Sequence, residues 1–250
     1  MAHIIAIVNQ KGGVGKTTSS INIAAGLYCA NKRTLLVDFD PQANATSGFG
    51  VDRGSSPHIY DVLINEVDAS KAVVSTPWGD LLPSNKALAG AELELIGAEE
   101  REFCLRRALR PLHLLYDYII IDCPPSIGLL TLNALCASNA VLVPVQCEYY
   151  ALEGLSNLTH TIRLVKQRLN PTLSLQGVVL TMFDNRTNLS SQVADEVKRH
   201  FPGKVYKTVI PRNVRLSESP SHGLPIFGYD KLSRGAIAYG ELVQEIVTKK

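Results

Sequence analysis

The first 30 residues carry the feature that most constrains the fold. A β-branched apolar run, His3–Asn9, stops at a glycine-rich turn, and helix-forming sequence follows from about Lys16 to Ala30. A short apolar run that ends at such a turn is typical of a buried parallel strand. Strand, glycine-rich turn, Lys-Thr and helix, in this order, are the context of a phosphate-binding loop. The order therefore predicts an α/β fold with an anion site at the end of its first strand.

The rest of the chain repeats the alternation of strands and helices. Apolar runs predict five more strands, at Thr34–Asp38, Tyr118–Asp122, Ala140–Val145, Leu175–Thr181 and Lys204–Ile210. Helical spacing occupies Leu152–Leu169, about Ser191–Phe201 and Gly235–Val247. This alternation predicts a single-domain α/β fold over residues 1–250, with a mostly parallel twisted β-sheet flanked by helices on both faces. Residues 50–100 give no legible pattern.

The glycine-rich loop, residues 11–18, has the composition of a phosphate cradle. Glycines let the backbone curl so that successive N–H groups point at phosphate oxygens, and the following helix directs its positive end at the same anion. We expect Lys16 to reach the β- and γ-phosphates of a nucleotide, and the Thr17 hydroxyl to bind Mg²⁺. A glycine-rich turn with a purely structural role is the alternative. The residues expected to bind the nucleotide are Lys11, Gly12, Gly13, Val14, Gly15, Lys16, Thr17 and Thr18.

One departure from the general phosphate-loop pattern is informative. The pattern G-x-x-x-x-G-K-[ST] needs glycine at position 10, but this chain has Gln10 there, and an extra lysine, Lys11, follows it. The form K-G-G-x-G-K-[ST] resembles the deviant Walker A motif of the ParA/MinD group. The resemblance implies that Lys11 reaches across an ATP-dependent homodimer to the partner's nucleotide. There it would stabilise charge on the transferring phosphoryl group, as an arginine finger does. The alternative is a solvated loop lysine.

Three aspartates follow the ends of predicted strands. Asp122 ends a strand after three isoleucines, which is the pattern of a Walker B aspartate, and Asp38 and Asp40 flank Phe39 after the second strand. Aspartates at such positions can hold Mg²⁺ or orient the attacking water, and in-line attack on a γ-phosphate needs little else. The segment D-F-D-P-Q resembles the A-prime motif of ParA proteins, which implies that Asp40 activates water and that Asp38 lies near the metal. The alternative for each aspartate is a helix cap or a turn.

The resemblance to ParA/Soj chromosome-partitioning ATPases extends along nearly the whole chain. It includes V-D-F-D-P-Q-A-N-A-T, Y-I-I-I-D-C-P-P-S, P-V-Q-C-E-Y-Y-A-L-E-G-L, T-M-F-D-N-R-T-N-L and V-I-P-R-N-V-R-L-S-E-S-P-S-H-G. The last three segments are far more specific than a phosphate loop. The segment P-R-N implies that Pro211 and Asn213 hold an adenine base, so that ATP rather than GTP is bound with Mg²⁺ and hydrolysed. The chain has Glu218-Ser219-Pro220 where the family more often has E-A-P.

Charge is distributed unevenly along the chain. Residues 1–150 contain 11 Lys/Arg and 15 Asp/Glu, whereas residues 151–250 contain 14 and 8. The basic part either faces a polyanion or merely solvates helix faces. Arg186 and Arg215 resemble family residues that bind double-stranded DNA without sequence preference, through its phosphates. Local salt bridges are the alternative. The resemblance also implies a ParB/Spo0J-type centromere-binding partner that stimulates hydrolysis and releases the dimer from DNA, which would segregate a chromosome or plasmid.

Two other functions share the phosphate loop. A membrane-surface ATPase like MinD needs a basic amphipathic helix after the closing helix. Here the sequence ends on the predicted closing helix itself, so we expect no such membrane helix. A metallocluster reductase like the nitrogenase iron protein needs cysteines that bind a cluster between subunits. The five cysteines show no C-x-x-C spacing, so we expect buried free thiols: Cys29, Cys104, Cys123, Cys136 and Cys147. No apolar run reaches about 20 residues. We therefore expect no membrane contact and a cytoplasmic location, and the resemblance to partitioning ATPases implies association with the nucleoid.

Overall fold

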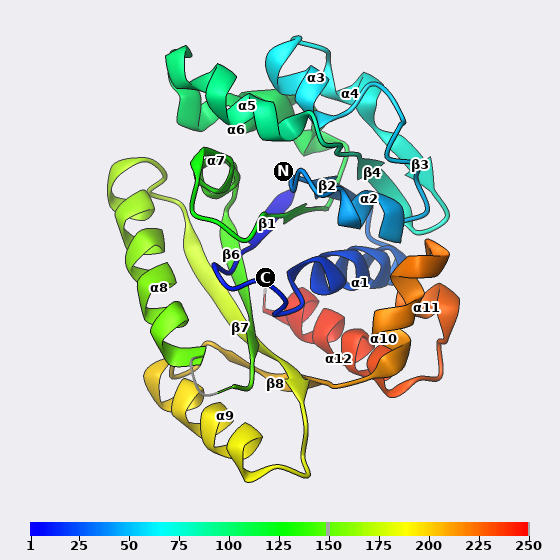
Figure 1. The fold of residues 1–250 in the computed structure, drawn as a ribbon, viewed down its shortest axis with the longest axis vertical. Helices are drawn as coiled ribbons and strands as arrows, with labels where there is room; N and C mark the ends of the chain where they lie inside the picture. The colour runs from blue at the N-terminus through cyan, green and yellow to red at the C-terminus, as the bar shows by residue number, and fades with distance from the viewer. Residues whose placement is uncertain (149–150, 250) are drawn as a thin grey trace.

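One eight-stranded sheet runs through the centre of the molecule (Figure 1). The computed structural model describes residues 1–148 and 151–249. The strand order in the sheet is β3-β4-β2-β5-β1-β6-β7-β8. In chain order the strands are β1 (His3–Ile7), β2 (Thr34–Asp38), β3 (Val74–Thr76), β4 (Gly79–Leu82), β5 (Tyr118–Asp122), β6 (Ala140–Gln146), β7 (Ser174–Phe183) and β8 (Val205–Pro211). All six strands expected from the sequence are present.

The central strands are aligned so that their carboxyl ends meet. β5 pairs in parallel with β1 and with β2, and Asp122 lies opposite both Ile7 and Asp38. β4 extends the same parallel arrangement beyond β2, with Val37 opposite Leu82. Only β3 runs antiparallel among the described strands, as a hairpin with β4. The mostly parallel sheet is confirmed, and the loops that follow β1, β2, β4 and β5 leave the same edge, where open α/β sheets bind ligands.

Helices cover both faces of the sheet (Figure 1). Side chains alternate along each strand, so Ile5 and Ile7 pack on one face while Ile4 and Ala6 pack on the other. The first face carries α1 (Lys16–Cys29), α2 (Asn44–Gly48), α10 (Val214–Glu218), η4 (Ser219–His222), α11 (Ile226–Tyr229) and α12 (Arg234–Thr248). The second face carries α3 (Ile59–Ile64), α4 (Ala69–Ala72), α5 (Leu88–Glu94) continued by η1 (Leu95–Gly97), η2 (Arg101–Phe103), α6 (Cys104–Leu109), η3 (Arg110–Leu114), α7 (Leu129–Ala137), α8 (Ala151–Arg168) and α9 (Asn188–His200).

The structure departs from expectation mainly in the segment without a legible pattern. Residues 50–100 form β3, β4 and the short helices α3, α4 and α5. Elements of three to seven residues repeat too few times to give a recognisable period. Helix α9 also begins at Asn188, three residues earlier than expected, because the Thr187 side chain accepts a hydrogen bond from Ser190 N and caps it.

The cysteines correct one expectation. Cys29 is exposed, since it lies in the last turn of α1 on its outer side, whereas the other four cysteines are buried free thiols. Among the described residues, no three His, Cys, Asp or Glu side chains gather as a metal site. None of the helices described is both long enough and apolar enough to cross a membrane.

Close packing of α1 against the C-terminal helices makes a direct prediction. A Cβ on Gly26 of α1 would lie 2.8 Å from Val243 Cγ2 and 3.1 Å from a ring carbon of Phe227. The variant Gly26→Ala should therefore lower the free energy of unfolding by about 1–3 kcal/mol through overpacking, despite the better helix propensity of alanine. Gly240 of α12, which has no atom within 4 Å of its Cβ position, is the matched control.

Urea denaturation measures both variants. Gly240→Ala should raise stability by about 0.5–1 kcal/mol because alanine loses less backbone entropy on folding. Equal stabilities of the two variants would contradict the close packing of α1 on α11 and α12.

Candidate nucleotide-binding site

The loop between β1 and α1 has a conformation that only its glycines permit. Gly13 and Gly15 have φ of +74° and +88°, in the left-handed region. Gly15 is the N-cap of α1, and its lack of a side chain leaves the first helical N–H groups without a side-chain cap. These N–H groups and the positive end of the helix dipole face the loop, which is the arrangement that binds an anion.

Lys16 lies beneath the loop. Its Nζ donates to the Lys11 carbonyl oxygen at 3.0 Å, and only 7% of the residue is exposed. Burial lowers the pKa of its ammonium group, and the carboxylates of Asp122 and Asp40 oppose that shift. Lys16 therefore lies between the loop and the carboxylates, and its contact with the β- and γ-phosphates stays a prediction.

Asp122, at the end of β5, is fully buried beside α1. Its Oδ1 accepts a hydrogen bond from Ser20 Oγ at 2.8 Å. Its Oδ2 is buried and has no hydrogen-bond partner among the described residues. Burial raises the pKa of this carboxyl group, and so does the negative charge of Asp38, while the nearby hydroxyls of Ser20 and Thr17 favour the ionised form. An orphaned carboxylate oxygen next to the Thr17 hydroxyl suits a hard divalent cation such as Mg²⁺.

Asp38, opposite Asp122 on β2, is also fully buried, but its oxygens are already engaged. Oδ2 accepts from Thr46 N at 2.6 Å and from Thr46 Oγ1 at 2.7 Å, and Oδ1 accepts from Asp40 N at 3.2 Å. Burial raises the pKa of Asp38, and these hydrogen bonds oppose the shift. Asp38 lies near the expected metal position, yet its contacts are those of a residue that anchors the loop after β2.

Asp40 follows Asp38 by two residues and lies at the same edge of the sheet. Its Oδ1 accepts from Gln42 N at 2.9 Å, and its carbonyl oxygen accepts from Ala43 N at 2.9 Å. Only 7% of the residue is exposed. The contacts hold the Asp40 carboxylate in one place close to Lys16, whose pKa it influences.

A cavity of about 380 Å³ opens beside the phosphate loop. Gly15 and Thr18 line it from one side, and Pro211 and Asn213 line it from the other. Asn213 Oδ1 caps α10 by accepting from Leu216 N at 3.4 Å. A mostly apolar cavity with a few polar groups, adjacent to a phosphate cradle, has the character of a nucleobase pocket.

Lys11 lies at the exposed rim of the loop. Its Nζ forms an ion pair of 2.7 Å with Glu148 Oε2, and 43% of the lysine side chain is exposed. Gln146 also donates a hydrogen bond to Glu148. The lysine therefore turns away from the cradle of its own chain, toward the loop that follows β6.

Comparisons with known proteins identify the family of this chain. A family model described as "AAA domain" matches residues 2–175. The chain is 57% identical over 249 residues to the sporulation initiation inhibitor protein Soj of Bacillus subtilis, with 98% of each chain covered. It is 54% identical over 252 residues to the chromosome partitioning protein ParA of Myxococcus xanthus, with 100% of this chain and 89% of that one covered. The chain belongs to the ParA/Soj family of chromosome-partitioning ATPases.

A solved structure of a protein with another name shares the fold of this chain. The cobyrinic acid a,c-diamide synthase of Mycobacterium smegmatis, with a bound ATP analog and magnesium, matches with a TM-score of 0.87 and 39% identity, covering 99% of this chain and 95% of that one. As a member of the ParA/Soj family, the chain is an ATPase. ATP and Mg²⁺ are consistent with its phosphate cradle, its buried carboxylates and the adjacent cavity.

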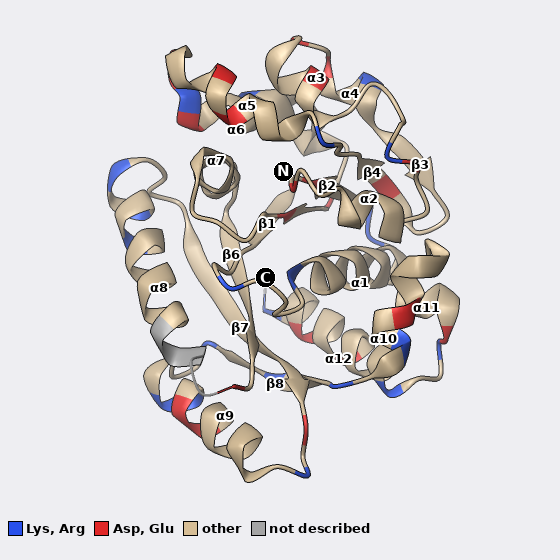
Figure 2. Ribbon diagram, viewed as in Figure 1, with Lys and Arg blue, Asp and Glu red and all other residues tan. Residues whose placement is uncertain are grey.

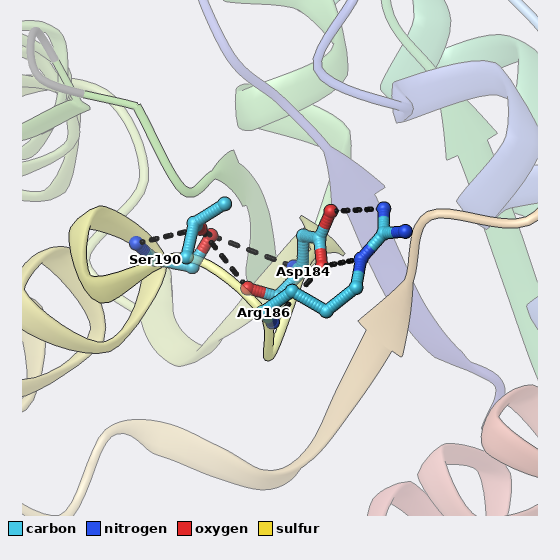
Figure 3. Close-up of polar contacts among 4 residues, drawn as sticks. Asp184, Arg186 and Ser190 are labelled. Carbon is cyan, nitrogen blue, oxygen red and sulfur yellow. Dashed lines mark hydrogen bonds and ion pairs between the residues drawn. The ribbon is translucent and has the colours of Figure 1, made fainter.

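The two arginines expected to bind DNA lie outside this nucleotide site of the ParA/Soj fold. Arg186 follows β7 and makes a two-pronged ion pair with Asp184, at 2.9 Å from Nε and 2.7 Å from Nη2 (Figure 3). Arg215 in α10 pairs with Glu218 at 3.0 Å and with Asp230 at 3.5 Å. Both arginines are exposed, and both carry the local salt bridges that were the alternative reading of their sequence.

Basic and acidic residues alternate on this side of the molecule. Figure 2 shows basic segments between β8 and α10 and on α9, with acidic segments close to each. Arg212 and Arg234, which the sequence did not single out, line a cavity of about 670 Å³ together with Arg186. The C-terminal basic excess is therefore partly gathered here.

Several residues that contact the site were not predicted from the sequence. Ser20 contacts Asp122, Thr46 contacts Asp38, Thr181 donates to the Val14 carbonyl oxygen at 2.8 Å, and Glu148 pairs with Lys11. Serine and threonine are common in any sequence, and these contacts depend on the fold. For Glu148 a signal existed, since it lies within the family-like segment P-V-Q-C-E-Y-Y.

The buried position of Lys16 makes a prediction about nucleotide affinity. Its ammonium group is expected to make charge-assisted hydrogen bonds to phosphate, so Lys16→Ala should weaken ATP binding at least about a hundredfold. Isothermal titration calorimetry with Mg²⁺ and ATP measures the loss. Lys71→Ala, which removes an exposed lysine of α4, should bind ATP like the parent protein. Comparable affinities of both variants would remove Lys16 from the site.

Proposed function

We propose that the chain is an ATP-dependent DNA-partitioning ATPase that works as a switch. ATP binding drives a sandwich homodimer that binds double-stranded DNA without sequence preference, and hydrolysis releases it. The observation that carries the proposal is the different burial of the two lysines of the phosphate loop. Lys16 is buried within its own chain, whereas Lys11 is exposed at the rim and reaches out from the cradle. This difference suits a loop that serves its own nucleotide and that of a second chain.

The arrangement of the chain's own residues supports hydrolysis by positioning and charge. The loop N–H groups and Lys16 would hold the phosphates, and Thr17 and Asp122 would hold Mg²⁺. Asp38 supports the loop that carries Asp40. Bound Mg²⁺ neutralises charge on the phosphate oxygens and thereby supplies electrostatic stabilisation. Asp40 is the carboxylate left to orient the attacking water, because its position is fixed and its side chain faces the Lys16 region.

Dimer formation requires Lys11 to exchange partners. In the single chain it pairs with Glu148, and both side chains are nearly half exposed. An ion pair this exposed contributes about 0–1 kcal/mol, so a phosphate group with more charge readily replaces the carboxylate. ATP in a facing subunit offers such a phosphate, and ADP, which lacks the γ-phosphate, offers less charge to this lysine.

DNA binding follows the same logic of exchange. Arg186 and Arg215 are exposed and held by carboxylates, so a DNA phosphate can replace Asp184 or Glu218 as their partner. A dimer presents each arginine twice, and that doubling makes DNA affinity depend on nucleotide state. Family membership supports a ParB/Spo0J-type centromere-binding protein as the partner that stimulates hydrolysis, with the protein located on the nucleoid in the cytoplasm.

The role of Asp40 can be tested directly. Asp40→Ala should bind ATP like the parent protein but hydrolyse it at least about a hundredfold more slowly, because the attacking water loses its orienting base. Phosphate release in a single turnover measures the rate. Asp195→Ala, which removes an exposed carboxylate of α9, is the control and should keep the parent rate. Hydrolysis by Asp40→Ala at the parent rate would assign the water to another residue.

A second prediction concerns Arg186 and its partner Asp184. Arg186→Glu should weaken binding to random-sequence DNA in the presence of ATP and reduce the salt dependence by about two phosphate contacts per dimer. Asp184→Asn should tighten DNA binding, since it frees the guanidinium group but keeps an oxygen for the turn. Arg33→Glu is the matched control, because Arg33 pairs in the same two-pronged way with Asp117, before β2 and far from Arg186 in the sheet order.

Fluorescence anisotropy over a series of salt concentrations makes the measurement, and ATP hydrolysis without DNA should be unchanged in all three variants. Equal losses in Arg186→Glu and Arg33→Glu would show only a general effect of charge. A membrane-surface ATPase like MinD is the competing function. Sedimentation with liposomes, without any binding to DNA, would favour it over the proposal.

A further inference from the structure

A closed ring of buried hydrogen bonds lies behind Asp40. Asp40 N donates to Asp38 Oδ1 at 3.2 Å, and Thr46 Oγ1 donates to Asp38 Oδ2 at 2.7 Å. Ser84 N donates to the same Thr46 oxygen at 2.9 Å, and Ser84 Oγ donates to the Asp40 carbonyl oxygen at 2.8 Å, which closes the ring. Thr46 and Ser84 are at most 1% exposed, so water does not compete for these bonds.

Ser84 reaches this place because of the strand that precedes it. β4 runs parallel to β2, with Leu82 opposite Val37, so the residues after β4 emerge beside the loop after β2. The Pro83 carbonyl oxygen accepts from Ile59 N at 2.9 Å, which fixes the chain between β4 and Ser84. Residues 50–100, which show no legible sequence pattern, thus place Ser84 behind the Asp40 loop of the candidate site.

We propose that Thr46 and Ser84 are positioning residues for the hydrolytic step, which they serve by fixing the backbone of Asp40 from both sides. The proposal rests on the proposed function, in which the Asp40 carboxylate orients the attacking water. Neither residue touches the nucleotide region itself. Both act through Asp40, whose N–H and C=O groups are the two points at which the ring holds the loop.

The physical reason is the sensitivity of water attack to distance and angle. The Asp40 carboxylate projects from a short loop, and among the described residues its hydrogen bond comes from Gln42 N, in the same loop. The position of the carboxylate therefore depends on where the loop backbone is held. Loss of the Ser84 hydroxyl leaves the Asp40 carbonyl with only the hydrogen bond from Ala43 N, three residues further along the chain in the same turn. Small displacements of a catalytic group slow a reaction strongly while leaving substrate binding intact.

The experiment compares serine variants that lose the same kind of bond. Ser84→Ala removes a buried hydroxyl-to-carbonyl bond of 2.8 Å behind Asp40. Ser138→Ala, the matched control, removes a buried hydrogen bond of 2.7 Å from its hydroxyl to the Ala134 carbonyl oxygen. Ser138 lies between the end of α7 and the start of β6, at the amino ends of the parallel strands and so on the other side of the sheet from Asp40. Thr46→Val and Thr46→Ser form a second pair, in which valine lacks the hydroxyl and serine keeps it. Single-turnover ATP hydrolysis, ATP affinity and the melting temperature are measured for all four and for Asp40→Ala.

Ser84→Ala and Thr46→Val should hydrolyse bound ATP about tenfold more slowly with ATP affinity changed less than about twofold. Thr46→Ser should restore the parent rate, and Ser138→Ala should keep it although its melting temperature falls as much as that of Ser84→Ala. If Asp40→Ala stalls while Ser84→Ala and Thr46→Val hydrolyse like Ser138→Ala, the positioning role is overturned and the proposed function stands. If Asp40→Ala itself hydrolyses at the parent rate, the role of Asp40 falls and the positioning role with it.

Discussion

The structure of the site depends on two carboxyl groups that are buried side by side at the ends of β2 and β5. Asp38 and Asp122 are register partners without exposed surface, and burying paired carboxylates is unfavourable unless other groups compensate them. Asp38 is compensated within the chain by Thr46 and by the Asp40 amide. Asp122 is compensated only in part, by the hydroxyls of Ser20 and Thr17 and by the charge of Lys16. A cation held beside its unpartnered Oδ2 would offset the remaining cost of burial, which is why Asp122 suits the proposed Mg²⁺ site.

The charged residues discussed above fall into two groups, buried ones with fixed partners and exposed ones whose partners can be replaced. Lys16, Asp38, Asp40 and Asp122 are buried, and hydrogen bonds within the chain hold each of them. Lys11, Arg186 and Arg215 are exposed, and each is paired with a carboxylate that a phosphate can replace. In the proposed function, nucleotide chemistry and polyanion binding therefore rest on different physical properties of the molecule. The first depends on preorganisation, and the second depends on competition between surface charges.

The sequence predicted those parts of the site whose residues are contiguous or whose strands are long. The phosphate loop, Asp122 after three isoleucines, and Asp38 and Asp40 after an apolar strand could all be located, because each lies where a regular element ends. Pro211 and Asn213 came from family resemblance, and the structure places them on the same cavity as Gly15 and Thr18. Ser84 could not be predicted, because β4 is four residues long and its pairing with β2 depends on tertiary contacts. The ion pair of Lys11 with Glu148 also depends on where two loops meet, and a sequence pattern does not encode that. The pair of Arg186 with Asp184 lies within one loop and was an open alternative in the sequence.

The central claim is that ATP joins two chains through the phosphate loop. Size-exclusion chromatography with multi-angle light scattering tests it most directly, on the parent protein with Mg²⁺ and a non-hydrolysable ATP analogue and then with ADP. We expect about twice the chain mass of 27.2 kDa with the analogue, and the single-chain mass with ADP. In Lys11→Ala the analogue should bind but no longer double the mass. A parent protein that stays at the single-chain mass with the analogue bound would contradict the account.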